Sequence, residues 1–199
     1  MMQVLFYVAL SLGLGLLTFF VLWAMLRGVQ LQILELRMRR QLNQKDFEGA
    51  LVTIGQALRL NPAGGSLYYQ RAQLYTQMGD FLSAEADYTH VLRFSQSATA
   101  YAGRAAARLK LDMTKEALVD ANHAIACSRL WWRGYYERGR VYATLGHYSI
   151  ALDDFNQALD LNRTPPSELY LARAEAADHL GDSETAGRDR QRATELSRS

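Results

Sequence analysis

Four aspartates follow four arginines at the same distance along the chain. The pairs, each separated by sixteen residues, are Arg71 with Asp87, Arg104 with Asp120, Arg138 with Asp154, and Arg173 with Asp189. A carboxylate can act as a general acid or base, but that chemistry needs one unique group in a pocket and not four copies. The repetition therefore predicts structural ion pairs that join one element to the next. Thr53 replaces the aspartate in an earlier segment, so the pairing there must differ.

The other residues that could bind a metal or take part in catalysis are isolated along the chain. His90 and His123 are 33 residues apart, but the sequence offers no third metal ligand beside them, so we expect two exposed histidines and no metal site. Cys127 is the single cysteine and lies on an apolar helical stripe, which favours a buried thiol. The sequence contains no phosphate-binding glycine loop, HExxH motif or nucleophile elbow. We therefore expect a protein that is not an enzyme and binds no cofactor.

The charged pairs are part of an internal repeat of the sequence. Five arginines recur with gaps of 34, 33, 34 and 35 residues, and five alanines recur with the same gaps. These residues are Arg37, Arg71, Arg104, Arg138 and Arg173, with Ala50, Ala84, Ala117, Ala151 and Ala186. Two residue types that share one period indicate stacked supersecondary units of about 34 residues.

Residues 133–162 show what one unit contains. The segment YYERGRVYATLG predicts a helix with the small Gly139 between two tyrosines, and Gly146 marks a turn. The following segment, YSIALDDFNQALDL, has one apolar helical stripe that includes Ala151 and Phe155. Two antiparallel helices can approach closely only where one side is small, so Gly139 and Ala151 are expected at their contact.

This order of tyrosine, small residue, tyrosine and A-x-x-x-F resembles the tetratricopeptide repeat, and the resemblance covers roughly residues 31–199. Five units begin near residues 31, 65, 98, 132 and 167, and the first and last are atypical. The resemblance implies an all-α solenoid of helix-turn-helix units that binds proteins on a concave face lined by the first helices.

The first 26 residues carry no charged side chain. As a helix they would be about 39 Å long, enough to cross a hydrocarbon core of about 30 Å. We therefore expect a transmembrane anchor at residues 1–26, a juxtamembrane helix with a first repeat-like unit at 27–64, and a solenoid with a C-terminal capping helix at 65–199. With neither glycine nor proline between Val29 and Glu48, the anchor is expected to continue into the first unit as one helix.

The arginines that follow this segment predict its orientation. Arg27, Arg37, Arg39 and Arg40 lie after the span and no basic side chain precedes it, which places the N-terminus outside and the repeats at the cytoplasmic face. The plan resembles anchored repeat adaptors of the bacterial inner membrane and assembly factors of photosystem I on the stromal or cytoplasmic side of thylakoids. Ala9 and Gly13 form a small-xxx-small pair that can bring two spans together, so a homo-oligomer is one of the alternatives.

By the resemblance, nine residues are expected in the partner-binding groove. They are Tyr69, Gln73, Gln77, Ala102, Ala106, Leu109, Arg133, Tyr136 and Arg140. The last unit adds Glu168, Glu175 and Asp178, so the groove is expected to change sign along its length. Trp131 and Trp132 either close the joint between two units or form an exposed anchor for a partner.

Relatives of this family that capture a C-terminal carboxylate use a clamp of Lys, Asn, Asn, Lys and Arg. The matching residues here are Tyr69, Gln73, Gly103, Arg133 and Glu137. Only Arg133 keeps the required charge and Glu137 reverses one, so capture of that kind is not expected.

Composition and repeats together predict a class of function. A formal net charge of +2 with 21% charged residues excludes a strongly basic nucleic-acid binder. We expect a membrane-anchored scaffold or adaptor that binds protein partners during assembly or regulation of a membrane complex. The alternative is a structural protein whose repeats bind further copies of the chain and coat the membrane.

Overall fold

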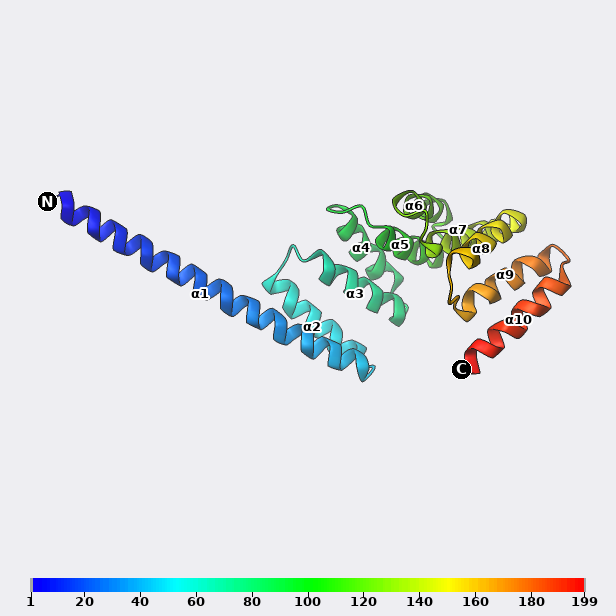
Figure 1. Cartoon of the computed structure of the whole chain (residues 1–199), viewed down its shortest axis with the longest axis horizontal. Coiled ribbons are helices and arrows are strands. Elements are labelled where there is room, and N and C mark those ends of the chain that lie inside the picture. The colour runs from blue at the N-terminus through cyan, green and yellow to red at the C-terminus, as the bar shows by residue number, and fades with distance from the viewer. Residues whose placement is uncertain (1, 199) are drawn as a thin grey trace. The chain divides into compact units, whose positions relative to one another are not determined.

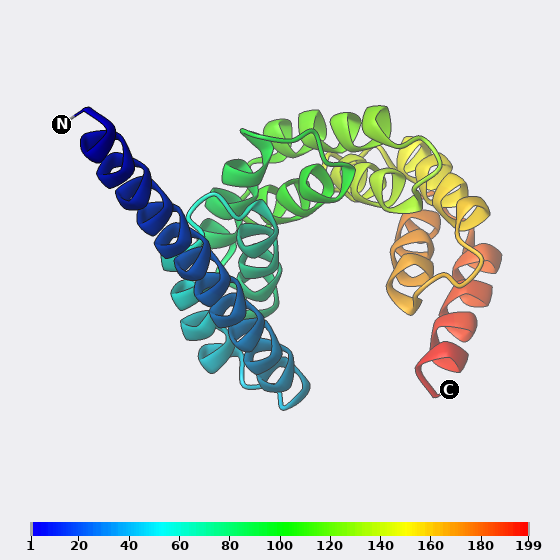
Figure 2. The ribbon, with the colours of Figure 1, turned by 60° about the vertical axis from the view of Figure 1, so that its left-hand side comes forward.

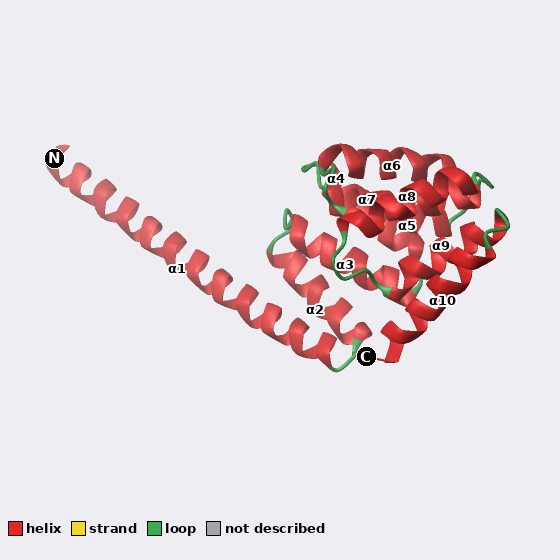
Figure 3. Ribbon diagram, turned by 45° about the vertical axis from the view of Figure 1, so that its right-hand side comes forward, coloured by secondary structure: helices red, strands yellow, loops and turns green. Residues whose placement is uncertain are grey.

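The computed structural model describes residues 2–198, with side chains from Leu16 to Arg198, and in this range it contains ten α-helices and no strand (Figure 3). The helices are α1 (Met2–Asn43), α2 (Phe47–Leu60), α3 (Gly65–Met78), α4 (Phe81–Leu92), α5 (Ala98–Lys110), α6 (Thr114–Cys127), α7 (Trp132–Thr144), α8 (Tyr148–Leu161), α9 (Ser167–His179) and α10 (Ser183–Arg198). The prediction of an all-α solenoid of helix-turn-helix units is confirmed.

The chain divides into two compact units, one ending at Leu67 and the other beginning at Tyr68. In the first unit, α1 runs through Gly28 without a break, as the sequence predicted (Figure 1). The C-terminal part of α1 packs against α2 and buries Met38, Ile54 and Leu58 between them. The side chains of Ala9 and Gly13 lie outside the described residues.

The boundary falls in the first turn of α3, and the second unit contains the rest of α3 and helices α4 to α10 in four antiparallel pairs, which form a curved stack from teal to red in Figure 2. Its first helices begin at residues 65, 98, 132 and 167, which confirms four predicted starts. Each pair packs on the next, and the first helices α5, α7 and α9 also contact one another in sequence.

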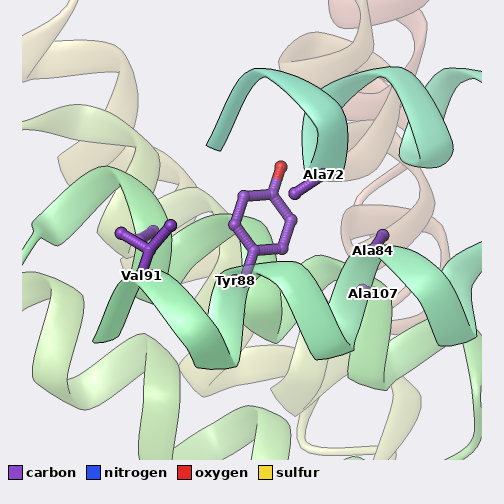
Figure 4. Close-up of a cluster of buried hydrophobic side chains, with 6 residues drawn as sticks. Ala72, Ala84, Tyr88, Val91 and Ala107 are labelled. Carbon is purple, nitrogen blue, oxygen red and sulfur yellow. The ribbon is translucent and has the colours of Figure 1, made fainter. Parts of the chain in front are cut away.

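The helices of the second unit approach at small side chains. The cluster around Tyr88 contains Ala72, Ala84, Val91, Ala100 and Ala107, all buried. Figure 4 shows the Tyr88 ring extending from α4 toward Ala72 on α3. A Cβ atom added to Gly103 would lie 2.4 Å from this ring, so glycine on α5 leaves the space that the tyrosine occupies.

The predicted arginine–aspartate pairs are confirmed in all four units. Each arginine donates two hydrogen bonds from Nε and Nη2 to both carboxylate oxygens, at 2.7–2.9 Å, and joins the first helix of a pair to the second. All four aspartates are buried. The bond to Asp87 raises the pKa of Arg71, and Asp154 and Asp189 do the same for Arg138 and Arg173.

The first unit uses a neutral pair instead. Thr53, which replaces the aspartate, is buried and donates a hydrogen bond from Oγ1 to Gln41 Oε1 at 2.7 Å. Arg37 is exposed. The prediction that pairing differs in this unit is confirmed.

A residue with positive φ lies in every turn between the helices of a pair, two residues before the second helix begins. These residues are Lys45, Gly79, Asp112, Gly146 and Gly181, with φ between 57° and 81°. The gaps between them are again 34, 33, 34 and 35 residues, so the rhythm extends to the backbone conformation. Glycine adopts this conformation freely, whereas Lys45 and Asp112 adopt it at a steric cost.

Two predictions about exposure are wrong. Cys127 is exposed and not buried, because it is the last residue of α6 and lies beyond the part of the helix that packs. His90 is half-buried and not exposed, because its ring stacks on Tyr68 with centroids 3.7 Å apart. His123 is exposed as predicted and stacks on Tyr101 at 5.0 Å.

We predict that Gly139→Ala destabilises the second unit by about 1–3 kcal/mol, because overpacking a filled core forces neighbours apart. The added Cβ would lie 2.7 Å from Phe155 Cε1 and 3.2 Å from the Ala151 carbonyl oxygen. Gly187→Ala on α10 is the matched control, since its Cβ meets nothing within 4 Å, and it should stabilise the helix by about 0.5–1 kcal/mol. Urea unfolding followed by circular dichroism measures both, and equal effects would contradict the prediction.

We also predict that Asp120→Asn lowers the free energy of unfolding by about 3 kcal/mol or more, since it breaks a buried ion pair. Asp120 is 1% exposed and accepts hydrogen bonds from Arg104 and Arg108. Glu35→Gln removes the exposed pair with Arg39 and should cost less than about 0.5 kcal/mol. The same urea experiment compares the two; a cost for Asp120→Asn as small as that of the control would show that the buried pair is not structural.

Candidate functional site

A hollow of the second unit lies where the first helices α5, α7 and α9 follow one another. It is a partly open pocket of about 460 Å³. Its lining residues are Leu109, Lys110, Tyr136, Arg140, Ala143, Thr144, Tyr148, Phe155, Glu168, Leu171, Ala172, Glu175 and His179. Most come from first helices, which is the side on which the sequence placed the partner-binding groove.

Three of the nine predicted groove residues line this pocket: Leu109, Tyr136 and Arg140. Tyr136 is only 7% exposed, since its ring also packs against Phe155 with centroids 6.1 Å apart. It therefore forms part of the pocket floor. Burial raises the pKa of Tyr136 above its ordinary value.

The other six predicted residues lie elsewhere along the first helices. Gln73 and Gln77 are exposed on α3, and Gln73 Nε2 donates to the Tyr69 hydroxyl at 3.3 Å. Ala106 is half-buried on α5, whereas Ala102 is 1% exposed and has almost no surface for a partner. Arg133 is exposed near the start of α7.

Glu137, the residue that reverses the clamp charge, is buried between two arginines. Its Oε2 atom accepts a hydrogen bond from Arg140 Nη1 at 2.7 Å, and its Oε1 lies 3.5 Å from Arg133 Nε. Burial alone lowers the pKa of Arg140, but the negative charge of Glu137 raises it and the net shift is upward. The carboxylate thus holds Arg140 by a hydrogen bond, lies close to Arg133, and offsets part of the charge of both arginines.

The two tryptophans are both half-buried. Trp132 packs against the cluster formed by Tyr136, Ala151 and Phe155, and its ring centroid lies 5.9 Å from that of Tyr136. Trp131 precedes the first turn of α7, where its carbonyl accepts the backbone N–H of Gly134. Trp132 therefore packs against its own helix pair and α9. Closure of the joint between the third and fourth units, and the use of either residue as an anchor for a partner, stay predictions.

The sequence did not identify several residues of the pocket. Leu171 and His179 line it, and Lys110 contributes a charge at the end of α5. Leu171 lies 35 residues after Tyr136, which is the repeat gap between the last two units. Applying that gap to the predicted groove residues would have found Leu171. Lys110 and Tyr148 have no comparable signal.

The pocket keeps opposite charges apart. Lys110 and Arg140 come from α5 and α7, while Glu168 and Glu175 come from α9. Within the described chain, no ion pair of 4.0 Å or less joins either cation to either of these glutamates. His179 stacks face to face on Tyr148 at 3.9 Å, and no group of three or more His, Cys, Asp or Glu side chains among the described residues could coordinate a metal.

Comparison with known sequences identifies the repeats. Residues 65–97 and residues 132–165 each match the Tetratricopeptide repeat family. Human serine/threonine-protein phosphatase 5 is 33% identical over 103 residues, which are 47% of this chain and 20% of the phosphatase. Human tetratricopeptide repeat protein 12 is 28% identical over 99 residues, 46% of this chain and 14% of that protein. The chain thus spans a fifth or less of the length of these relatives.

Solved structures show the same fold at lower identity. TTC0263, a thermophilic tetratricopeptide repeat protein of Thermus thermophilus, superposes with a TM-score of 0.72 at 22% identity, over 83% of this chain and 91% of that one. MamA from Desulfovibrio magneticus RS-1 gives a TM-score of 0.68 at 20% identity, over 85% and 96% of the two chains. The chain therefore carries tetratricopeptide repeats at residues 65–97 and 132–165, within an all-α solenoid of the tetratricopeptide type.

Proposed function

We propose that this protein is a membrane-anchored adaptor whose pocket between α5, α7 and α9 binds a segment of a partner protein. The observation that carries the proposal is the set of separated, opposite charges around an apolar floor. Tetratricopeptide repeats are protein-binding modules of scaffolds, and the non-catalytic role expected from the sequence agrees with that class.

The charges define the partner segment. An acidic side chain fits beside Lys110 and Arg140, and a basic one fits beside Glu168 and Glu175. Between them, an apolar side chain can contact Tyr136, Phe155 and Leu171. The segment therefore has an acidic, an apolar and a basic residue in the order in which it passes α5, α7 and α9.

A protein with a similar fold has a peptide-binding site. YrrB, described as a tetratricopeptide repeat protein with an unusual peptide-binding site, superposes with a TM-score of 0.58 at 17% identity, over 80% of this chain and 82% of that one. The likeness shows a shared fold, and peptide binding is carried to this chain as part of the proposal.

The anchor is the second part of the proposal. The helical segment Leu16–Asn43 is long and apolar enough to cross a membrane, with a mean hydropathy of 1.5. The stretch with this hydropathy has no buried residue. The Arg27 guanidinium lies over the Trp23 ring, 5.2 Å from its centroid, an arrangement suited to the headgroup region. We propose the division into anchor at 1–26, juxtamembrane part at 27–64 and solenoid at 65–199, with the repeats at the cytoplasmic face.

Site-specific photocrosslinking in native membranes tests the partner. A photoreactive phenylalanine replaces Leu171, which is 50% exposed in the pocket, and replaces the exposed Gln157 on α8 as the matched control. We expect an adduct with a different protein from position 171 alone, and its mass identifies the membrane complex served. Adducts only with the same chain would favour the self-assembling alternative, and no adduct from position 171 would contradict the proposal.

Charge reversal tests whether the charged residues of the pocket bind the partner. Lys110→Glu and Glu175→Lys should each weaken partner binding about five- to thirtyfold, because each replaces an attraction by a repulsion worth about 1–2 kcal/mol in total. The controls, Lys115→Glu and Glu184→Lys, change exposed charges outside the pocket and should leave the adduct yield unchanged. Equal losses from controls and pocket variants would show that net charge, and not the pocket, controls binding.

A further inference from the structure

Six apolar residues of α1 form a stripe with heptad spacing. Phe19, Leu22, Leu26, Val29, Ile33 and Leu36 follow one another at intervals of three and four residues. All six are between 52% and 68% exposed. A regular alternation of three and four gives a mean period of about 3.5 residues, the repeat with which two α-helices pack along a continuous seam. These six residues are called the heptad stripe.

The heptad stripe lies on the face of α1 that α2 does not use. The α2-facing residues include Met38, which is buried, and Leu31 and Leu34, which are half-buried. Ile33 follows Leu31 by two residues, or about 200° around the helix. Arg27, whose side chain donates to the Leu60 carbonyl at the end of α2, is also off the stripe. Packing in the first unit therefore leaves the stripe open along its whole length.

Membrane lipid cannot cover the C-terminal end of the heptad stripe. With Arg27 at the headgroup level, Leu36 lies nine residues further along α1, a distance of about 14 Å. Exposure of these apolar side chains to water is equally unfavourable, because the outer face of a terminal solenoid helix is normally polar. The C-terminal helix α10 follows that rule and exposes Arg188, Arg190 and Gln191. The first helix instead exposes Val29, Ile33 and Leu36.

We infer that the heptad stripe binds the same stripe of a second copy of this chain, as a parallel two-stranded coiled coil that continues from the span into the first repeat. Two spans inserted in the same direction meet in parallel and in register, as identical heptads require. Ile33 occupies the a position and Leu36 the following d position, a combination that favours two strands, whereas the preceding pair, Leu26 at a and Val29 at d, has the reverse arrangement and adds nothing to that preference.

The flanking residues are compatible with this pairing. Gln32 of one helix faces Arg37 of the other across the seam, and Met25 faces Gln30, so no like charges oppose each other beside the stripe. The next a position is Arg40, where two like charges would meet, and the seam ends there. The pairing uses residues of the first unit and none of the pocket residues, so its test does not depend on finding a partner protein.

Disulfide crosslinking of the full chain in lipid vesicles tests the inference. The exposed Cys127 is first replaced by serine, and single cysteines are then placed at Val29, Ile33 or Leu36. The controls are Gly28→Cys and Glu35→Cys. Each lies one residue before a stripe position, Val29 or Leu36, and is rotated from it by about 100° around the helix. Under mild oxidation we expect at least tenfold more dimer from the stripe positions than from the controls, because only they bring two Cβ atoms within disulfide range.

A second measurement separates pairing from chance collisions. The detergent-solubilised chain should have the mass of a dimer, and Ile33→Lys with Leu36→Lys should convert it to a monomer of unchanged helix content, since both side chains are more than half exposed. Gln56→Lys, on an exposed position of α2, should leave the dimer intact. A monomeric parent chain, a larger assembly, equal crosslinking at the control positions, or a dimer that survives the lysines would each overturn the inference.

Discussion

The two helices of each pair approach closely because alanine occupies the position where the second helix meets the first. Ala84, Ala117, Ala151 and Ala186 have no exposed surface, and they recur with the period of the whole chain. Close approach also lets a short aspartate and an arginine sixteen residues earlier meet through two hydrogen bonds. A larger side chain at the alanine would separate the helices, and the buried carboxylate would then lose its partner. The apolar contact and the ion pair therefore depend on the same spacing.

Periodic features could be predicted from the sequence because the same residue type recurs at equivalent positions of several units. The helix starts, the four ion pairs and the exception at Thr53 all follow from comparing equivalent positions. Features that occur once were not. The exposure of Cys127 depends on where α6 ends, and the burial of Tyr136 depends on Phe155 from the neighbouring helix. Positive φ at Lys45 and Asp112 was missed since glycine marks that position elsewhere. The change of charge along the groove was expected from Glu168 and Glu175, whereas the presence of Lys110, Tyr148 and His179 in the pocket depends on the packed positions of the helices.

The pocket owes its charge pattern to positions that differ from unit to unit. At equivalent positions along the groove, α3 and α5 have uncharged residues such as Gln73 and Ala106, while α7 has Arg140 and α9 has Glu175. Conserving the alanine and ion-pair positions preserves the fold, which leaves the groove positions free to differ between units. Differences at the groove positions thus change the recognition surface without changing the helix packing.

The unbroken path of α1 through Gly28, together with the contact between Arg27 and the end of α2, has a mechanical consequence. A helix that spans a bilayer responds to hydrophobic mismatch by changing its tilt. With α1 in a membrane, the first helix pair would turn through the same angle as the span, because no hinge absorbs the motion. A change in bilayer thickness or lateral pressure would therefore reorient the first repeat directly, and the anchor would act as a rigid lever as well as an attachment.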